Sequence, residues 1–191
     1  MQFFSKQLSV SILLLGMLVP IGMVGQTPAS LCQPDEAVLF SCRLEGNSRI
    51  VSLCTTPKSL PLQSVAYRYG TASKVELTYT ATPQSANRFA ATVSPAKPGV
   101  TINQVWFETK GTRYVLTECV GGDCAHDGGI IVLRSGRTLM SRACSKDSGN
   151  QSYFSSKIID FESDLNGSHS KTDLIQLKEY DNHIDALYPW K

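Results

Sequence analysis

The densest group of chemically versatile residues lies in the stretch 119–129, which reads CVGGDCAHDGG. Asp123, His126 and Asp127 stand there among four glycines, and His126 is the one histidine between residues 32 and 144. An imidazole between two carboxylates can donate and accept hydrogen bonds from one short segment. The pattern predicts a recognition loop, because a loop that is already constrained to one shape loses less conformational entropy on binding. A hairpin connection without a binding role is the alternative that the same residues allow.

Cys119 and Cys124 decide which chemistry this stretch can have. A disulfide between them is predicted, because the two glycines inside the loop let the chain turn back on itself. As thiolates, the two sulfurs and His126 would offer three ligands, one fewer than a structural zinc site needs. Asp123 and Asp127 lack the regular spacing of oxygen ligands in a calcium loop. The sequence therefore predicts neither a metal nor a cofactor.

Catalytic motifs do not occur in the sequence. It contains no pattern typical of a nucleophilic serine elbow, a zinc protease, a P-loop or a dinucleotide site. The expected role of every cysteine in a disulfide also removes the thiol nucleophile. We therefore predict a protein that is not an enzyme. Because paired carboxylates need only proximity in space, an envelope hydrolase built on Glu108, Glu118, Asp123 or Asp127 stays an alternative.

The first 29 residues predict an export signal. Lys6 precedes an apolar run over residues 8–24, and residues 27–29 supply the small side chains typical of a cleavage point. The alternative is a membrane anchor, but an apolar run of about 17 residues is at the lower limit for spanning a bilayer. We therefore expect a periplasmic or secreted protein that has no transmembrane span after signal cleavage.

Six cysteines follow this signal, and an even number in an exported chain predicts three disulfides. Besides Cys119 and Cys124 they are Cys32, Cys42, Cys54 and Cys144. Six cysteines allow 15 pairings, so the partners of these last four stay open. Their positions predict a disulfide-linked domain over residues 32–144.

Short apolar runs separated by turn residues fill this domain. The nine predicted strands are 38–44, 49–53, 65–69, 74–80, 88–93, 102–108, 112–117, 130–133 and 137–141. Strands at this spacing are typical of a mainly β fold, an antiparallel sandwich or barrel. Within one strand Val75, Leu77 and Tyr79 alternate with polar residues, which predicts one shared buried face.

Four aromatic residues of these strands leave a further alternative open. Tyr67, Tyr69, Tyr79 and Trp106 could line the interior of a barrel and bind a small ligand. The same residues could equally fill a solid core, because aromatic side chains dominate core packing.

Residues 145–191 differ from the domain in composition. They contain no cysteine, carry 5 cations against 8 acids, and are rich in serine and asparagine, whereas residues 32–144 carry 12 cations against 8 acids. Leu174, Leu177, Ile184 and Leu187 recur at helical spacing, and so do residues 158, 161 and 165. We predict a partly helical extension, either packed on the domain or free to reach a partner. The near-neutral balance predicts no nucleic-acid binding.

Five short motifs connect the domain to a known group of proteins. They are LFSC at 39–42, VSLC at 51–54, YRYG at 67–70, VEL at 75–77 and GTRY at 111–114. In this order they resemble motifs of an uncharacterised family of small exported β-sheet proteins from Gram-negative bacteria. The resemblance implies an exported β fold and carries no assigned activity.

A second likeness is confined to residues 85–110. The segment SANRF at 85–89, with Trp106 and a later Lys-Gly, is similar to segments of periplasmic inhibitors of c-type lysozyme. The resemblance implies that Ser85 and Arg88 approach acidic catalytic residues of the enzyme and that Lys110 supports them. Arginine would act there through charge-assisted hydrogen bonds. A purely structural role for these loop residues is the alternative.

These observations together favour a non-enzymatic domain that binds another protein of the cell envelope, as an inhibitor or immunity-type protein does. The predicted binding residues are Ser85, Arg88, Lys110, Asp123, His126 and Asp127.

Overall fold

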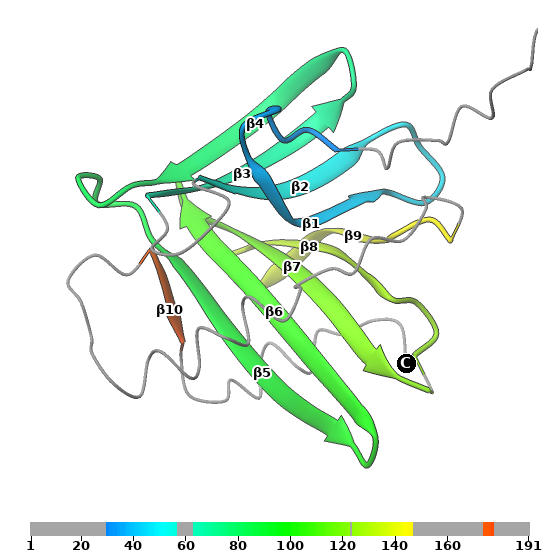
Figure 1. Ribbon diagram of the computed structural model, residues 1–191. Helices are drawn as coiled ribbons and strands as arrows, with labels where there is room; N and C mark the ends of the chain where they lie inside the picture. Colours follow the sequence, from blue (N-terminus) through cyan, green and yellow to red (C-terminus); the bar gives the residue numbers. More distant parts are fainter. Residues whose placement is uncertain (1–29, 57–62, 123, 147–173, 178–191) are drawn as a thin grey trace, which may run out of the picture.

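The chain folds into two layers of antiparallel β-sheet (Figure 1). The computed structural model describes residues 30–56, 63–122, 124–146 and 174–177. Its strands are β1 (Ala37–Arg43), β2 (Ile50–Thr56), β3 (Ser64–Thr71), β4 (Lys74–Ala81), β5 (Phe89–Lys97), β6 (Val100–Thr109), β7 (Thr112–Gly121), β8 (Gly128–Arg134), β9 (Arg137–Ala143) and β10 (Ile175–Leu177). The nine strands predicted within residues 32–144 are all present, so the predicted fold class is confirmed. No described residue belongs to a helix long and apolar enough to cross a bilayer.

The first nine strands follow one another as a meander. One sheet has the order β1-β2-β3-β4 and the other β10-β5-β6-β7-β8-β9, and the strands of the two layers cross in Figure 1. The first and last strands of the meander meet through a bridge between Leu44 and Cys144 and through a hydrogen bond from the Ser145 N–H to the Arg43 carbonyl oxygen (2.8 Å). The two sheets therefore join at β1 and β9.

Tight turns set the register of the meander. Lys110 and Gly111 join β6 to β7 with φ angles of 49° and 69°, and Ser135 and Gly136 join β8 to β9 with 49° and 74°. Two consecutive positive φ angles are the signature of the two-residue turn whose twist matches that of paired strands. Both turns lie in gaps between strands that the sequence predicted.

An aromatic cluster fills the space between the sheets. Phe107 stacks on Tyr79 with ring centroids 4.1 Å apart and on Tyr114 at 5.0 Å, and it contacts Tyr67 at 4.8 Å and Phe89 at 5.5 Å. Burial, with smaller contributions from neighbouring tyrosines, raises the pKa of Tyr67 well above its ordinary value. That phenol therefore stays neutral.

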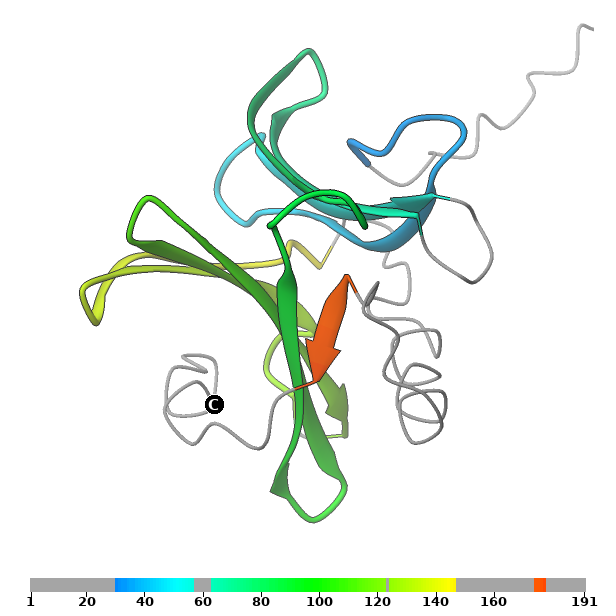
Figure 2. The same cartoon turned by 90° about the vertical axis from the view of Figure 1, so that its left-hand side faces the viewer.

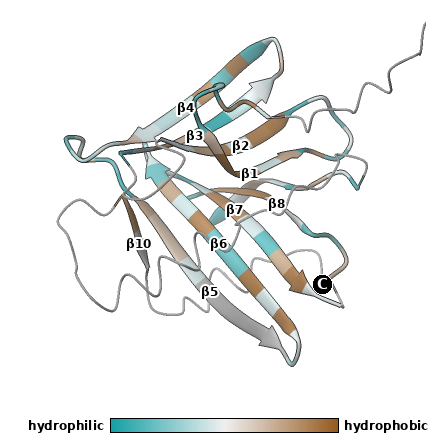
Figure 3. Ribbon diagram, in the orientation of Figure 1, coloured by the Kyte–Doolittle hydropathy of each residue, from teal (hydrophilic) through white to brown (hydrophobic). Residues whose placement is uncertain are grey.

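Strand alternation decides which side chains reach this core. Figure 3 shows hydrophobic and hydrophilic residues alternating along β6 and β7. On β4, Leu77 and Tyr79 pack against the core as predicted, but Val75 is 43% exposed. Val75 lies near the start of the strand, beside the register shift that separates Tyr69 from Gly70 on β3. The prediction that Val75 is buried is wrong, because alternation gives the face of the sheet but not where the opposite layer ends.

The structure pairs all six cysteines. Cys32 bonds Cys54, Cys42 bonds Cys144 and Cys119 bonds Cys124, with Cα–Cα distances of 5.5, 5.6 and 5.8 Å. The predicted pair of Cys119 and Cys124 is confirmed. The other two pairs answer what the sequence left open. Cys42–Cys144 lies where β1 meets β9, so it links the first and last strands of the meander covalently.

The described part of the C-terminal extension is a strand. Ile175–Leu177 pair in parallel with Phe89–Ala91, which places β10 beside β5 (Figure 2). The prediction of a helix is wrong for these residues, because Leu174 and Ile175 are buried in the core between the sheets rather than on a helical face. The other predicted helical positions, and the export signal over residues 1–29, lie outside the described residues.

Candidate binding site at the disulfide-closed loop

The predicted binding residues fall into two groups at opposite ends of β6 and β7. Lys110 lies in the turn between the two strands, and Arg88 precedes β5, whose Ala90 pairs with Trp106 near the same end. His126 and Asp127 lie beyond Cys119, at the other end of β7. The seven residue steps from Thr112 to Cys119 span about 24 Å, at about 3.4 Å per residue. One surface cannot contain both groups at contact distance.

The group around Arg88 is largely engaged within its own turn. The Nη1 of Arg88 donates to the carbonyl oxygens of Ser85 and Asn87, at 2.7 Å each. The Ser85 hydroxyl donates to the Thr82 carbonyl oxygen (3.0 Å) and accepts from the Thr82 N–H (2.9 Å). These bonds stabilise the turn, and this structural role is enough to explain a serine at position 85 and an arginine at position 88. Binding by Ser85, Arg88 and the exposed Lys110 stays a prediction.

The second group belongs to the stapled loop, by which we mean residues 119–127 closed by the Cys119–Cys124 disulfide. The N–H of Cys119 donates to the carbonyl oxygen of Asp127 (2.9 Å), so the two sides of the loop are also joined by backbone. The strand that follows starts at Gly128, where a Cβ would lie 2.7 Å from the Thr117 carbonyl oxygen. Only glycine allows this close approach. Asp123 lies outside the described residues.

A hollow of about 230 Å³ opens beside the stapled loop. We call it the stapled-loop hollow, and it is lined by residues 124–127 and 144–146. Its polar and charged residues are His126, Asp127, Ser145 and Lys146, and the disulfides of Cys124 and Cys144 flank it. Small-molecule sites usually measure about 300–1,000 Å³. The size therefore suits one inserted side chain of a partner.

The sequence did not indicate Lys146 or Ser145 as part of this site. Both follow Cys144 directly, and the Cys144 N–H donates to the carbonyl oxygen of Gly128 (2.8 Å). The Cys42–Cys144 pairing and this bond bring the end of the domain against the stapled loop. The signal that could have found them is the disulfide partner of Cys144, which sequence alone does not give.

Two of the carboxylates considered for an envelope hydrolase, those of Glu108 and Glu118, do not form a catalytic pair. Glu108 is opposite Arg113 in the ladder and accepts a hydrogen bond from its Nε at 2.7 Å. Glu118 lies five residues further along β7, about 17 Å away at about 3.4 Å per residue. It is buried and accepts a hydrogen bond from Asn103 at 2.9 Å. Glycosidase carboxylates lie about 5–9.5 Å apart.

The aromatic residues considered for a small-ligand site do not line one cavity. Tyr67 and Tyr79 contact Phe107 between the sheets. Trp106 instead packs on the opposite face of its sheet, in a cluster with Val115, Ile131 and Leu133. Adjacent residues of a strand point to opposite faces, so Trp106 and Phe107 serve separate clusters.

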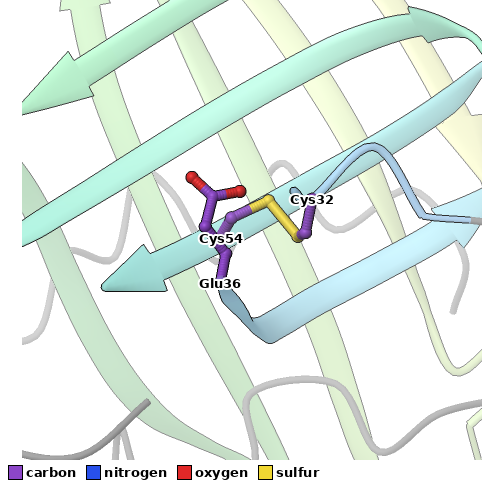
Figure 4. Close-up of side chains that lie close together, drawn as sticks. All are labelled: Cys32, Glu36 and Cys54. Carbon is purple, nitrogen blue, oxygen red and sulfur yellow. A yellow bond between two sulfur atoms is a disulfide. The ribbon is translucent and has the colours of Figure 1, made fainter. Parts of the chain in front are cut away.

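A feature that sequence reasoning missed lies on the outer face of the four-stranded sheet. Residues 30–36 cross this face, held by the Cys32–Cys54 disulfide and by Glu36 (Figure 4). The Glu36 carboxylate accepts hydrogen bonds from both terminal nitrogens of Arg68, the Nη2 bond measuring 2.8 Å, and from the Gln33 N–H at 2.6 Å. Arg68 and Glu36 are 32 residues apart in the sequence, so no local sequence pattern predicts the pair.

Cys32, Glu36 and Cys54 are also the one group of three metal-ligating residue types that lie close together within the described ranges. The two sulfurs are bonded to each other at 2.04 Å, so they offer no thiolate. The carboxylate is engaged by Arg68. The arrangement therefore serves to hold residues 30–36 on the sheet.

The ion pair of Glu36 and Arg68 predicts a pH-dependent stability. Burial acts to raise the pKa of Glu36, but the hydrogen bonds from Arg68 and Gln33 and the charge of Arg68 lower it overall. A lowered pKa gives stability that is present above the pKa of the unfolded chain and is lost as the pH falls through the folded pKa. Arg68→Ala is expected to reduce the free energy of unfolding by about 2 kcal/mol at pH 7, and urea unfolding at pH 7 and pH 3 measures it.

The matched control for this prediction is Arg49→Ala. Arg49 pairs with Glu76 at 2.9 Å, but the two side chains are 38% and 33% exposed, against 13% and 8% for Arg68 and Glu36. Exposed pairs contribute below about 1 kcal/mol. Equal losses in the two variants, or a loss for Arg68→Ala that does not shrink at low pH, would contradict the assignment.

Comparison with known proteins adds no assignment to these residues. No protein-family model matches the sequence, and no curated protein or solved structure matches it significantly. The resemblances to exported β-sheet proteins and to lysozyme inhibitors therefore rest on their short motifs.

Proposed function

We propose that this chain is an exported, non-enzymatic binding protein that acts on another protein of the cell envelope, as an inhibitor of a hydrolase or toxin. The observation that carries the proposal is the stapled loop with its adjoining hollow. Three disulfides in a chain with a predicted export signal support an oxidising compartment. The periplasm or the extracellular medium is the location that we propose.

The constraint on the stapled loop supports binding through this loop. Cys119 and Cys124 are five residues apart and covalently linked, and the strands on either side of the loop, β7 and β8, are paired with each other. A loop held in its bound shape before association loses little conformational entropy, and that is how inhibitors gain affinity for a cleft. Gly121 and Gly122 are exposed, so backbone of the loop is accessible.

The chemistry of the stapled-loop hollow supports a protein partner. Lys146 provides hydrogen-bond donors, Asp127 provides acceptors and His126 can provide either. Ala125 also lines the hollow and offers an apolar contact. A single side chain of a partner, inserted into the hollow, would meet donors, acceptors and an apolar rim together. Such an inserted anchor is typical of the energetic centre of an interface.

The proposal is tested by affinity capture from periplasmic extract and culture medium of the source organism, with bound proteins quantified by mass spectrometry. The wild-type chain is expected to retain a specific hydrolase or toxin. Lys146→Ala and the double variant Cys119→Ala/Cys124→Ala are expected to retain at least tenfold less, since loss of an anchor costs about 2 kcal/mol or more.

The control for the capture is Lys110→Ala, an exposed lysine at the opposite end of β6 and β7. It is expected to retain as much partner as the wild type. A larger loss with Lys110→Ala than with the loop variants would move the binding surface to the segment that resembles lysozyme inhibitors. Capture of no specific protein by the wild type would contradict the proposed function.

A further inference from the structure

The meander is open at one place among the described strands, between β4 and β5. These strands are consecutive in sequence but lie in different sheets. At one end the hydroxyl of Tyr79 donates to the Arg88 carbonyl oxygen (3.1 Å) and accepts from the Arg88 N–H (3.2 Å). Beyond this contact β10 pairs with the outer edge of β5, the edge that does not pair with β6 (Figure 2).

Backbone pairing holds β10 on this edge over three residues. Ile175, Gln176 and Leu177 are in register with Phe89–Ala91, and the Phe89 N–H donates to the Leu174 carbonyl oxygen at 2.9 Å. The pairing is parallel, whereas every other strand pair of the described residues is antiparallel. A strand contributed from far along the chain thus occupies an edge that the meander leaves unfilled.

Two apolar side chains anchor the strand. Leu174 is 3% exposed and Ile175 is 6% exposed, and both belong to the core cluster that contains Phe89. Backbone pairing along an edge with apolar side chains in adjacent pockets is how proteins recognise an added strand. The arrangement therefore has the form of a strand-recognition site that is occupied by the chain itself.

The link between β10 and the domain differs from that of the other strands. Within the meander consecutive strands are joined by connections of two to seven residues, and Cys42–Cys144 fixes its two ends. Residues 145–191 contain no cysteine, and 30 residues, 145–174, separate β10 from the end of the domain. Among the described residues, β10 is attached to the domain by three paired residues and by two buried apolar side chains.

We propose that the outer edge of β5 is a second binding surface. It binds an extended strand of a partner protein, and this strand carries two consecutive apolar residues. β10 occupies this surface in the unbound chain and is displaced when the partner strand pairs with Phe89–Ala91. The apparent affinity of the partner is then reduced by the fraction of molecules in which β10 is seated. This surface shares no residue with the stapled loop, so it does not depend on the proposed function.

The test uses the full chain and a fluorescein-labelled peptide with the sequence of residues 171–180, KTDLIQLKEY, followed by fluorescence anisotropy. The double variant Leu174→Ser/Ile175→Ser weakens β10 in the chain and is expected to bind the peptide at least tenfold more tightly than the wild type. A peptide with the same two serines is expected to bind neither chain. Equal affinity of the folded variant and the wild type would overturn the proposal.

A matched control and a second variant keep the test decisive. Leu139→Ser changes a 58% exposed leucine on β9, at the other side of the same sheet, and is expected to bind the peptide like the wild type. Gln176→Pro leaves both anchors in place but removes one backbone donor from β10, and it is expected to raise the affinity as well. Should neither variant fold, β10 would be an integral core strand and the proposal would be wrong. Self-association of the variants without peptide binding would equally overturn it.

Discussion

A chain in which Cys42 and Cys144 are both replaced by alanine is expected to lose about 5 kcal/mol of its free energy of unfolding. The disulfide joins residues 102 positions apart. Closing a loop of about 100 residues removes chain entropy from the unfolded state that corresponds to about 4.7 kcal/mol. Because this bond also links β1 to β9, its loss leaves that junction held only by backbone contacts such as the Leu44–Cys144 bridge and the hydrogen bond from Ser145 to Arg43 among the described residues. Alanine is chosen because both sulfurs are buried and a hydroxyl would add a polar burial cost.

The short disulfide provides the control for this experiment. Cys119 and Cys124 are five positions apart, and the same relation gives about 2 kcal/mol for a loop of this size. Urea unfolding of both double variants, with a common slope, measures the difference as a change in midpoint. The expected order is a much lower midpoint for Cys42→Ala/Cys144→Ala. Equal midpoints would contradict this expectation, because the long disulfide would then stabilise the fold no more than the short one.

The sequence predicted well where the signal is local. The turn at Lys110 and Gly111 spans two neighbouring positions, and a glycine between two predicted strands indicates it. The pair Cys119 and Cys124 spans five positions with glycines between, so its geometry is also local. Nine strands followed from alternation and turn residues for the same reason. These features gave the fold class and one half of the candidate site.

The features that the sequence could not give depend on contacts between distant segments. The partner of Cys144 is one of many allowed pairings, and without it Lys146 cannot be placed beside His126. Leu174 and Leu177 fit a helical spacing, yet pairing with β5 and burial of Leu174 in the core override that local preference. Intrinsic preference is a weak guide where tertiary contacts decide. The second half of the site and the occupied edge of β5 therefore emerge only in three dimensions.

The second large effect is expected for Phe107→Ala. Phe107 is 3% exposed and has ring contacts with four aromatic residues from β3, β4, β5 and β7, which are Tyr67, Tyr79, Phe89 and Tyr114. Removal of a buried phenylalanine costs about 3–5 kcal/mol through lost transfer energy and the cavity left behind. The aromatic pairs add about 0.5–1.5 kcal/mol each beyond their buried area, so we expect the upper part of this range.

Two comparison variants separate packing volume from ring contacts. Phe107→Leu keeps most of the volume but removes the ring pairs, and it is expected to cost more than the about 1.5 kcal/mol typical of volume-conserving exchanges. Val75→Ala changes an exposed position and is expected to stay within about 0.5 kcal/mol of the wild type. Urea unfolding followed by tyrosine fluorescence and near-ultraviolet circular dichroism measures all three. A loss below about 2 kcal/mol for Phe107→Ala would mean that the two sheets do not depend on this ring for their packing. Since β5 carries both Phe89 of this cluster and the edge that β10 occupies, a large loss would tie the proposed strand-binding surface to the stability of the core.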